Sequence, residues 1–272
     1  MPPTADDPLA AWRVRAAPFW RPVAGEEEAF AAATGARLPL LLTGPTGCGK
    51  TRFVEHMAWR LGRPLVTVAC HEDLTAGDLA GRWLLDADGT RWQDGPLALA
   101  ARHGAICYLD ELVEARSDAL VVVHPLADSR RVLPLDRKGE LLHAHPDFLL
   151  VASCNPSYRG LHKTLKPSTR QRFTALAFHY PLPEDETGIV AAEGGVDAGL
   201  AARLVALAQR TRRLQDDGLE EGASTRLLVH AAQLVRAGLS PRAACVQAIA
   251  MPLADDPELS GVLVALVHAA FD

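Results

Sequence analysis

The sequence predicts an α/β domain built on a central parallel sheet, followed by a small all-α domain. Short continuous apolar runs alternate with helical stretches through the first two thirds of the chain, which is typical of a parallel sheet covered on both faces. The first apolar run leads directly into a glycine-rich segment at residues 44–51. Beyond residue 184, apolar positions recur only with helical spacing.

Five apolar runs of strand length predict the sheet, at residues 38–43, 64–69, 105–109, 148–153 and 175–178. A helix is expected before them at residues 25–33, and further helices between them at residues 52–61 and 96–103. Two hairpins interrupt this alternation. The first spans residues 83–92, where Asp88-Gly89 is a tight-turn pair between apolar flanks, and the second spans residues 132–143 around Gly139.

The expected domain order is an N-terminal arm at residues 1–24, the α/β domain at residues 25–183 and an α-helical C-terminal domain at residues 184–272. Ser224 and Ser240 stand at helix starts in the last domain, where serine is a good N-cap. The helices predicted there are residues 198–213, 224–237, 241–250 and 257–271.

The composition excludes several classes of protein. A net charge of −5 argues against a nonspecific nucleic-acid binder, which carries a basic excess. The five cysteines are scattered and form no CxxC pair, which argues against a disulfide framework and a zinc site; Cys107 and Cys154 are expected to be small buried residues. The chain opens without a basic region followed by an apolar stretch, and no apolar run can span a bilayer, so we expect a cytoplasmic protein.

The glycine-rich segment matches the phosphate-binding pattern G-x-x-x-x-G-K-[ST], and it reads Gly44-Pro45-Thr46-Gly47-Cys48-Gly49-Lys50-Thr51. Glycines let backbone N–H groups turn inward around phosphates, and the following helix adds the positive end of its dipole. Lys50 is expected to reach the β- and γ-phosphates of ATP, and Thr51 to ligate Mg²⁺. We include Arg52, the next residue, among the nucleotide contacts.

Two acids follow the third apolar run, at the carboxyl end of the predicted strand, where ligands bind in open α/β sheets. Asp110 is expected to hold Mg²⁺ through its water shell, and Glu111 to orient and partly deprotonate the attacking water. A solvated acidic turn is the plainer alternative. The phosphate-binding loop earlier in the chain favours the catalytic interpretation.

Other polar positions carry weaker signals. Asn155 follows the fourth run and suits a contact with the γ-phosphate or the water, but an Asn before Pro156 is also a common turn. Arg170 and Arg172 suit the neutralisation of charge on a γ-phosphate, although spacing alone favours two exposed solubilising arginines. Arg226 lies early in a helix, where a cation is unfavourable without an anionic partner.

Together and in this order, these residues resemble the AAA+ ATPases, and more closely the MoxR group and its CbbQ/NirQ/NorQ family. The resemblance covers the chain from Pro22 to the C-terminus. The stretches that carry it are LLLTGPTGCGKTRFVEHMAWRLGRPLVTVACHEDLTAGDLAGRWLL, GTRWQDGPL, GAICYLDELVEAR, KGELLHAHPDFLLVASCNP, LKPSTRQRF and EGASTRLLV.

The resemblance implies a role for each position. Residues 44–51 correspond to the Walker A loop, and Asp110 with Glu111 to the Walker B acids. Asn155 corresponds to the first sensor, and Arg226 to the second sensor on a helical lid.

The same resemblance places an arginine finger acting in trans at Arg170 or Arg172, and we favour Arg172, which precedes Phe173. The hairpin around Asp88-Gly89 corresponds to an insertion in the second helix that faces the pore of such rings. The hairpin around Gly139 corresponds to one placed before the first sensor strand.

Members of this family form hexameric rings and remodel a metalloenzyme client together with a von Willebrand A-domain partner. CbbQ forms act on Rubisco, and NorQ or NirQ forms act on nitric oxide reductase. We therefore expect a homo-oligomer with both protein partners, without nucleic acid and without membrane insertion. Cys154 and Ser157 stand where relatives often have Tyr and Gly, and residues 159–163 are unusual, so the partner contacts of this loop are expected to differ.

Three other functions are compatible with parts of the sequence. A small-molecule P-loop kinase explains the loop and Asp110, but not the helical domain with Arg226. A nucleotide-dependent binding module predicts tight ATP binding with negligible phosphate release. A DNA-remodelling AAA+ protein predicts a salt-dependent DNA shift, which the acidic composition disfavours.

Overall fold

The computed structural model of the chain describes residues 8–87, 89–155, 164–214 and 218–271. These residues belong to two compact units. The first contains the described residues of Met1–Thr43, Lys50–Asn155 and His162–Ala177. The second contains those of Gly44–Gly49, Pro156–Leu161 and Phe178–Asp272, so the loop at residues 44–49 groups with the C-terminal helices.

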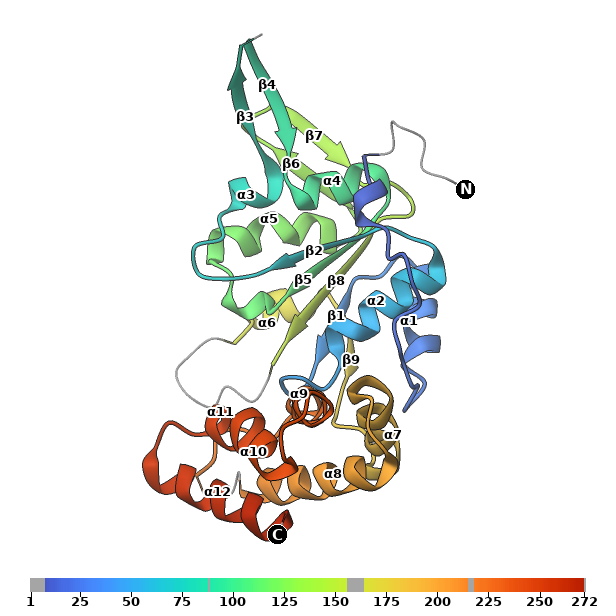
Figure 1. Ribbon diagram of the computed structural model, residues 1–272. Helices are drawn as coiled ribbons and strands as arrows, with labels where there is room; N and C mark the ends of the chain where they lie inside the picture. Colours follow the sequence, from blue (N-terminus) through green and yellow to red (C-terminus); the bar gives the residue numbers. More distant parts are fainter. Residues whose placement is uncertain (1–7, 88, 156–163, 215–217, 272) are drawn as a thin grey trace. The chain divides into compact units, whose positions relative to one another are not determined.

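A five-stranded parallel sheet forms the centre of the first unit, in the order β2-β5-β8-β1-β9 (Figure 1). The strands are β1 (Leu40–Thr43), β2 (Leu65–Ala69), β5 (Ile106–Asp110), β8 (Leu149–Cys154) and β9 (Thr174–Ala177). The inner strands β1, β5 and β8 are buried almost throughout, which explains their continuous apolar sequences. The predicted α/β fold class and all five predicted strands are confirmed.

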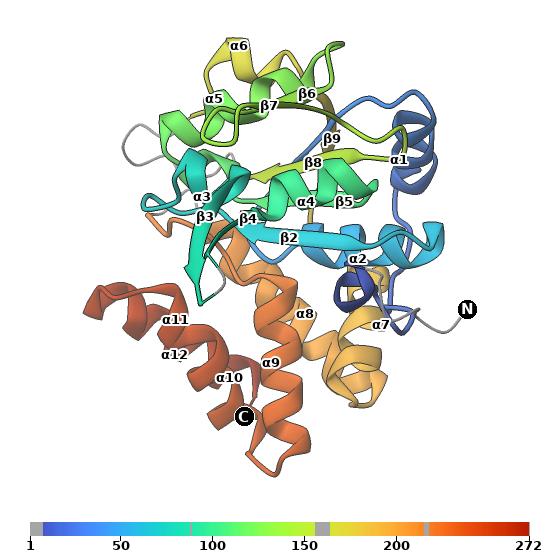
Figure 2. The same ribbon diagram turned by 90° about the horizontal axis from the view of Figure 1, so that it is seen from above.

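Helices cover both faces of this sheet (Figures 1 and 2). They are α1 (Glu26–Gly35), α2 (Lys50–Leu61), α3 (Ala76–Ala80), α4 (Pro96–His103), α5 (Ser117–Ala127) and α6 (Pro167–Arg170), with short 3₁₀ turns η1 (Ala10–Trp12) and η2 (Leu112–Glu114). Buried residues of α4 and α5 share one apolar cluster with Leu41, Cys107 and Leu150 of the strands. Helix α5 was not predicted, because Pro125 and the consecutive valines obscure its helical period.

Both predicted hairpins are present as antiparallel pairs, β3 (Gly81–Asp86) with β4 (Gly89–Asp94) and β6 (Val132–Leu135) with β7 (Glu140–His143). Asp88 of the predicted turn lies outside the described residues. Trp83 pairs across the strands with Trp92, and their rings meet edge to face at 5.5 Å. Trp83 Nε1 also donates to the Arg137 carbonyl at 2.9 Å, which ties the first hairpin to the turn of the second.

The described part of the second unit is helical. Its helices are α7 (Pro183–Gly194), α8 (Ala198–Arg213), α9 (Thr225–Arg236), α10 (Pro241–Cys245), α11 (Met251–Leu253) and α12 (Pro257–Ala270). Ser224 and Ser240 accept hydrogen bonds from the N–H groups of Leu227 and Ala243, which confirms both predicted N-caps. Helix α7 lies in the segment expected to be helical but was not among the four helices predicted there. The prediction of one regular helix over residues 241–250 was wrong, because the chain changes at Val246 into the π-helical turn η4 (Val246–Ala250).

Across the described residues, no helix is both long enough and apolar enough to cross a membrane.

Candidate nucleotide site

Three segments that carry the predicted site leave the sheet at the carboxyl ends of neighbouring strands. The order β5-β8-β1 places the end of β5, with Asp110 and Glu111, beside the end of β8, which leads to Asn155. The end of β1 is next in the sheet and leads into the phosphate-binding loop. This is the edge at which open parallel sheets bind their ligands.

The carboxylate of Asp110 lies at the centre of a hydrogen-bond network. Its Oδ1 accepts from Tyr108 Oη at 2.6 Å and from Ser153 Oγ at 2.6 Å. Its Oδ2 lies 3.3 Å from Thr51 Oγ1, on the first turn of α2. The structure therefore brings together the two side chains predicted to hold Mg²⁺, although they are far apart in the sequence.

The oxygen atoms of Thr51 and Asp110 suit Mg²⁺, which prefers hard oxygen ligands and usually takes only one or two from the protein beside phosphates and waters. Within the described ranges, no group of three or more His, Cys, Asp and Glu side chains gathers as a metal cage. The two side-chain oxygens of Thr51 and Asp110 fit the small number of protein ligands that Mg²⁺ usually takes.

Glu111 has an unusual backbone. It adopts the left-handed conformation, with φ 56° and ψ 49°, between β5 and η2. For a residue with a side chain this costs of order 1 kcal/mol or more, and such residues concentrate at functional sites. Ser153 Oγ accepts the Glu111 N–H at 2.9 Å and thus holds the strained residue to the end of β8.

Lys50 and Arg52 lie on the first turn of α2, where Arg52 forms an exposed ion pair with Glu55 at 3.7 Å. Asn155 is buried immediately after β8. Burial raises the pKa of the Cys154 thiol, while the charges of Lys50 and Arg170 oppose that rise. The charges of Lys50 and Arg170 are therefore both felt at Cys154, the last residue of β8.

The two predicted finger arginines differ in their surroundings. Arg170 is exposed at the end of α6. Arg172 is partly buried, and its guanidinium donates to the Ser168 carbonyl. Its Nε is buried and has no hydrogen-bond partner among the described residues. Burial lowers the pKa of His124, and the nearby charge of Arg172 lowers it further.

The phosphate-binding loop has its own contacts within the second unit. The Thr46 N–H donates to Glu221 Oε1 at 2.8 Å, and the Thr46 carbonyl accepts from Tyr180 Oη at 3.2 Å. Gly47 has φ 66°, and a Cβ there would lie 2.6 Å from Ser224 Oγ and 3.2 Å from Arg226 Cβ. Only glycine therefore fits at position 47. The Cβ of Arg226, the predicted second sensor, lies beside this part of the loop.

Sequence reasoning missed Tyr108, Ser153, Tyr180 and Glu221. A signal was available for the first two. Tyr108 precedes Asp110 by two residues and Ser153 precedes Asn155 by two, and side chains two apart in a strand point to the same face. No local pattern marks Glu221, because its contact with Thr46 spans 175 residues.

A sequence profile for the AAA domain of the dynein-related subfamily matches residues 39–173. Two solved structures share the fold over 89% of this chain. One is a candidate ATPase of Cytophaga hutchinsonii, with TM-score 0.51, 16% identity and 80% of that chain covered. The other is a RuvB variant of Thermotoga maritima, with TM-score 0.54, 14% identity and 68% covered. The fold, the loop and the acid pair thus define a P-loop ATPase of the AAA class.

A second profile, for the CbbQ/NirQ/NorQ C-terminal region, matches residues 186–270. Protein CbbQ of Hydrogenophilus thermoluteolus is 58% identical, covering 95% of this chain and 97% of that protein. The denitrification regulatory protein NirQ of Stutzerimonas stutzeri and protein NorQ of Paracoccus denitrificans are each 56% identical over 94% of this chain, covering 93% and 94% of theirs. The chain belongs to the CbbQ/NirQ/NorQ family, and these identities do not separate its branches.

Proposed function

We propose that this chain hydrolyses ATP to ADP and phosphate in a Mg²⁺-dependent reaction. Backbone N–H groups of the glycine-rich loop and the Lys50 ammonium would bind the phosphates, and Thr51 with Asp110 would hold the metal. Bound Mg²⁺ neutralises phosphate charge. Glu111 orients the attacking water, and Asn155 donates to that water or to the γ-phosphate.

One observation carries this proposal. Asp110 Oδ2 faces Thr51 Oγ1 at 3.3 Å, and the next residue, Glu111, is held in a strained conformation at the same strand end. A solvated acidic turn does not require a left-handed Glu111 or the hydrogen bond from its N–H to Ser153, whereas strained residues of this kind concentrate at functional sites.

Phosphate release and ATP binding, measured on the same preparation, test the proposal. ATP-dependent phosphate release that disappears when EDTA removes Mg²⁺ supports it. Tight ATP binding with negligible release supports the nucleotide-dependent binding module instead.

The proposal extends to assembly and partners. We place Arg172, or alternatively Arg170, on the γ-phosphate of a neighbouring subunit in a hexameric ring, and Arg226 on the bound nucleotide. The family membership supports a ring that remodels a metabolic enzyme together with a von Willebrand A-domain partner.

The first client that we propose is Rubisco inhibited by a tight-binding sugar phosphate, as a CbbQ-type activase would require; nitric oxide reductase is the alternative. Rubisco activity recovered by the chain, its A-domain partner and ATP supports the first client. Recovery of nitric oxide reductase alone supports the second.

A further inference from the structure

Two buried hydroxyl groups hold one oxygen of the Asp110 carboxylate. Tyr108 Oη and Ser153 Oγ both donate to Oδ1, each at 2.6 Å. A carboxylate oxygen offers about two acceptor sites, so these two bonds fill Oδ1. Oδ2 is left facing Thr51 Oγ1 at 3.3 Å. Oδ1 of Asp110 therefore accepts the two buried hydroxyls, and Oδ2 faces Thr51.

The directions of these hydrogen bonds follow from the number of hydrogens. Each hydroxyl carries one, and Tyr108 and Ser153 give theirs to Asp110. Ser153 Oγ is then left to accept the Glu111 N–H at 2.9 Å. Thr51 has one hydroxyl hydrogen, which it can give to Asp110 Oδ2 or to Tyr108 Oη, each 3.3 Å from its Oγ1. The network thus links Glu111, Asp110 and Thr51.

Burial makes this arrangement hard to replace. Tyr108 and Ser153 are both 0% exposed, so water does not compete for their hydroxyls. Ser153 comes from β8 and Tyr108 from β5, so the pairing of these strands determines where the carboxylate points.

We propose that Tyr108 and Ser153 are positioning residues that turn Oδ2 of Asp110 toward the metal, and that Ser153 couples this orientation to the backbone of Glu111. The proposal rests on the Mg²⁺-dependent ATP site proposed above. Partners of this kind, which orient a metal ligand without touching the metal, typically change metal affinity by tenfold or more when they are removed.

The test measures binding rather than turnover. A fluorescent ATP analogue is titrated onto the full chain in EDTA and, separately, at increasing Mg²⁺ concentration. Tyr108→Phe and Ser153→Ala are each expected to raise the Mg²⁺ concentration for half-maximal enhancement of binding about tenfold. Affinity in EDTA stays unchanged. The double variant shifts the midpoint by less than the product of the two single shifts, because both act on one oxygen.

Thr34→Val is the matched control, since it removes a part-buried hydroxyl that donates to the Phe30 carbonyl of α1 and does not contact Asp110. We expect it to leave the Mg²⁺ midpoint unchanged. Asp110→Asn is the reference for the metal site and shifts the midpoint further than either hydroxyl variant. Thermal melting checks that each variant is folded, and Ser153→Ala decides alone if Tyr108→Phe does not fold.

The outcomes separate the two levels of the proposal. If Asp110→Asn shifts the Mg²⁺ midpoint and the folded hydroxyl variants do not, the positioning role is wrong and the ATP site stands. If Asp110→Asn leaves the midpoint unchanged, the metal role of Asp110 is itself wrong.

Discussion

Asp110 and Glu111 are neighbours that both carry a carboxylate, but their surroundings give the two carboxylates different roles. The Asp110 carboxylate lies within hydrogen-bonding distance of three hydroxyl groups, which orient it. Glu111 is instead constrained through its backbone, in a left-handed conformation with its N–H on Ser153. A fixed carboxylate suits a metal, whereas a side chain directed by its backbone suits an attacking water.

Glu111→Gln is expected to retain ATP binding and to lose about 100-fold or more in turnover, because the amide cannot accept a proton from the water. Lys50→Ala removes the cation from the phosphates and is expected to weaken ATP binding itself. Phosphate release and nucleotide titration separate the two effects. Glu114→Gln, the same change three residues along the chain, is the control. Normal turnover in Glu111→Gln contradicts the assignment.

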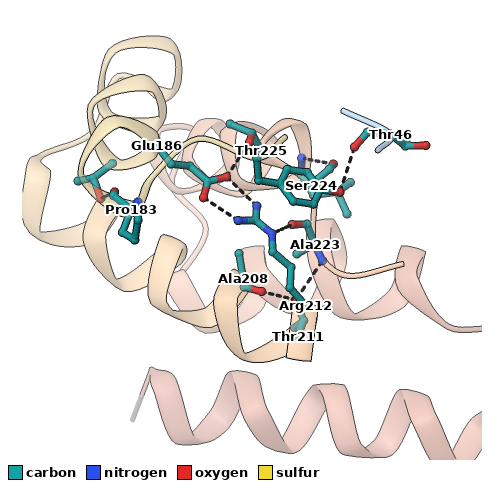
Figure 3. Close-up of polar contacts among 12 residues, drawn as sticks. Thr46, Pro183, Glu186, Ala208, Thr211, Arg212, Ala223, Ser224 and Thr225 are labelled. Carbon is teal, nitrogen blue, oxygen red and sulfur yellow. Dashed lines mark hydrogen bonds and ion pairs between the residues drawn. The ribbon is translucent and has the colours of Figure 1, made fainter. Parts of the chain in front are cut away.

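At the scale of elements, one ion pair joins three helices of the second unit (Figure 3). Glu186 of α7 is 0% exposed and accepts two bonds from Arg212 of α8, at 2.7 and 2.8 Å. Thr225 Oγ1 of α9 donates to the same carboxylate at 2.6 Å. The Arg212 guanidinium also lies over the Tyr180 ring, 3.8 Å from its centre. Tyr180 in turn holds the Thr46 carbonyl, so the loop and the helices share one network.

Arg212→Met is expected to destabilise the protein by about 3–5 kcal/mol, because it leaves the Glu186 charge buried without its partner. Urea unfolding followed by circular dichroism measures this. Adding Glu186→Gln to Arg212→Met should restore part of the loss, since the unpaired charge is then removed. Arg213→Met, at the exposed neighbouring position, is the control and should change stability by less than about 0.5 kcal/mol. A double variant less stable than Arg212→Met argues against an unpaired charge as the cause.

The β3–β4 hairpin is the element on which we place client contact. Its two-stranded ladder extends to the Asp86–Gly89 pair, and Leu85 near that end is 82% exposed. The tryptophan pair lies nearer its base, where Trp83 is tied to Arg137. The tip is therefore less constrained by other elements than the base.

Replacing residues 86–90 with a neutral Gly-Ser turn is expected to leave oligomer size and basal ATPase activity nearly unchanged and to abolish client activation. The assay is recovery of inhibited Rubisco, and then of nitric oxide reductase, with the A-domain partner present. Full activation of a client by this variant removes the hairpin from the mechanism. Replacing the turn at residues 136–139 in the same way controls for general damage to a hairpin.

At the scale of the whole molecule, a trans-acting arginine makes hydrolysis depend on neighbouring subunits. Arg172 suits that role because a planar guanidinium matches the geometry of a phosphate, and its buried Nε has no hydrogen-bond partner among the described residues. Its guanidinium also donates to the Ser168 carbonyl.

Specific ATPase activity is therefore expected to rise with protein concentration, and Arg172→Ala should bind ATP yet hydrolyse poorly. Mixing Arg172→Ala with Lys50→Ala subunits should restore part of the activity, because some interfaces then pair an intact loop with an intact arginine. The same mixture with Arg170→Ala in place of Arg172→Ala identifies which arginine acts. Activity that is independent of concentration, from a monomer, contradicts the ring mechanism.

The sequence by itself determined the strands, both hairpins, the phosphate-binding loop and the acid pair. Each consists of consecutive residues, whose pattern depends on local conformation and burial. Only the tertiary structure decided how the site is held. Asp110 meets Ser153 43 residues away because β5 and β8 pair in parallel, and no local pattern encodes that register. It meets Thr51 59 residues away because β1, which precedes α2 in the chain, pairs with the other side of β8. The same holds for Glu186 and Arg212, whose charges are tolerated in the interior only because the packing of α7 against α8 brings them together.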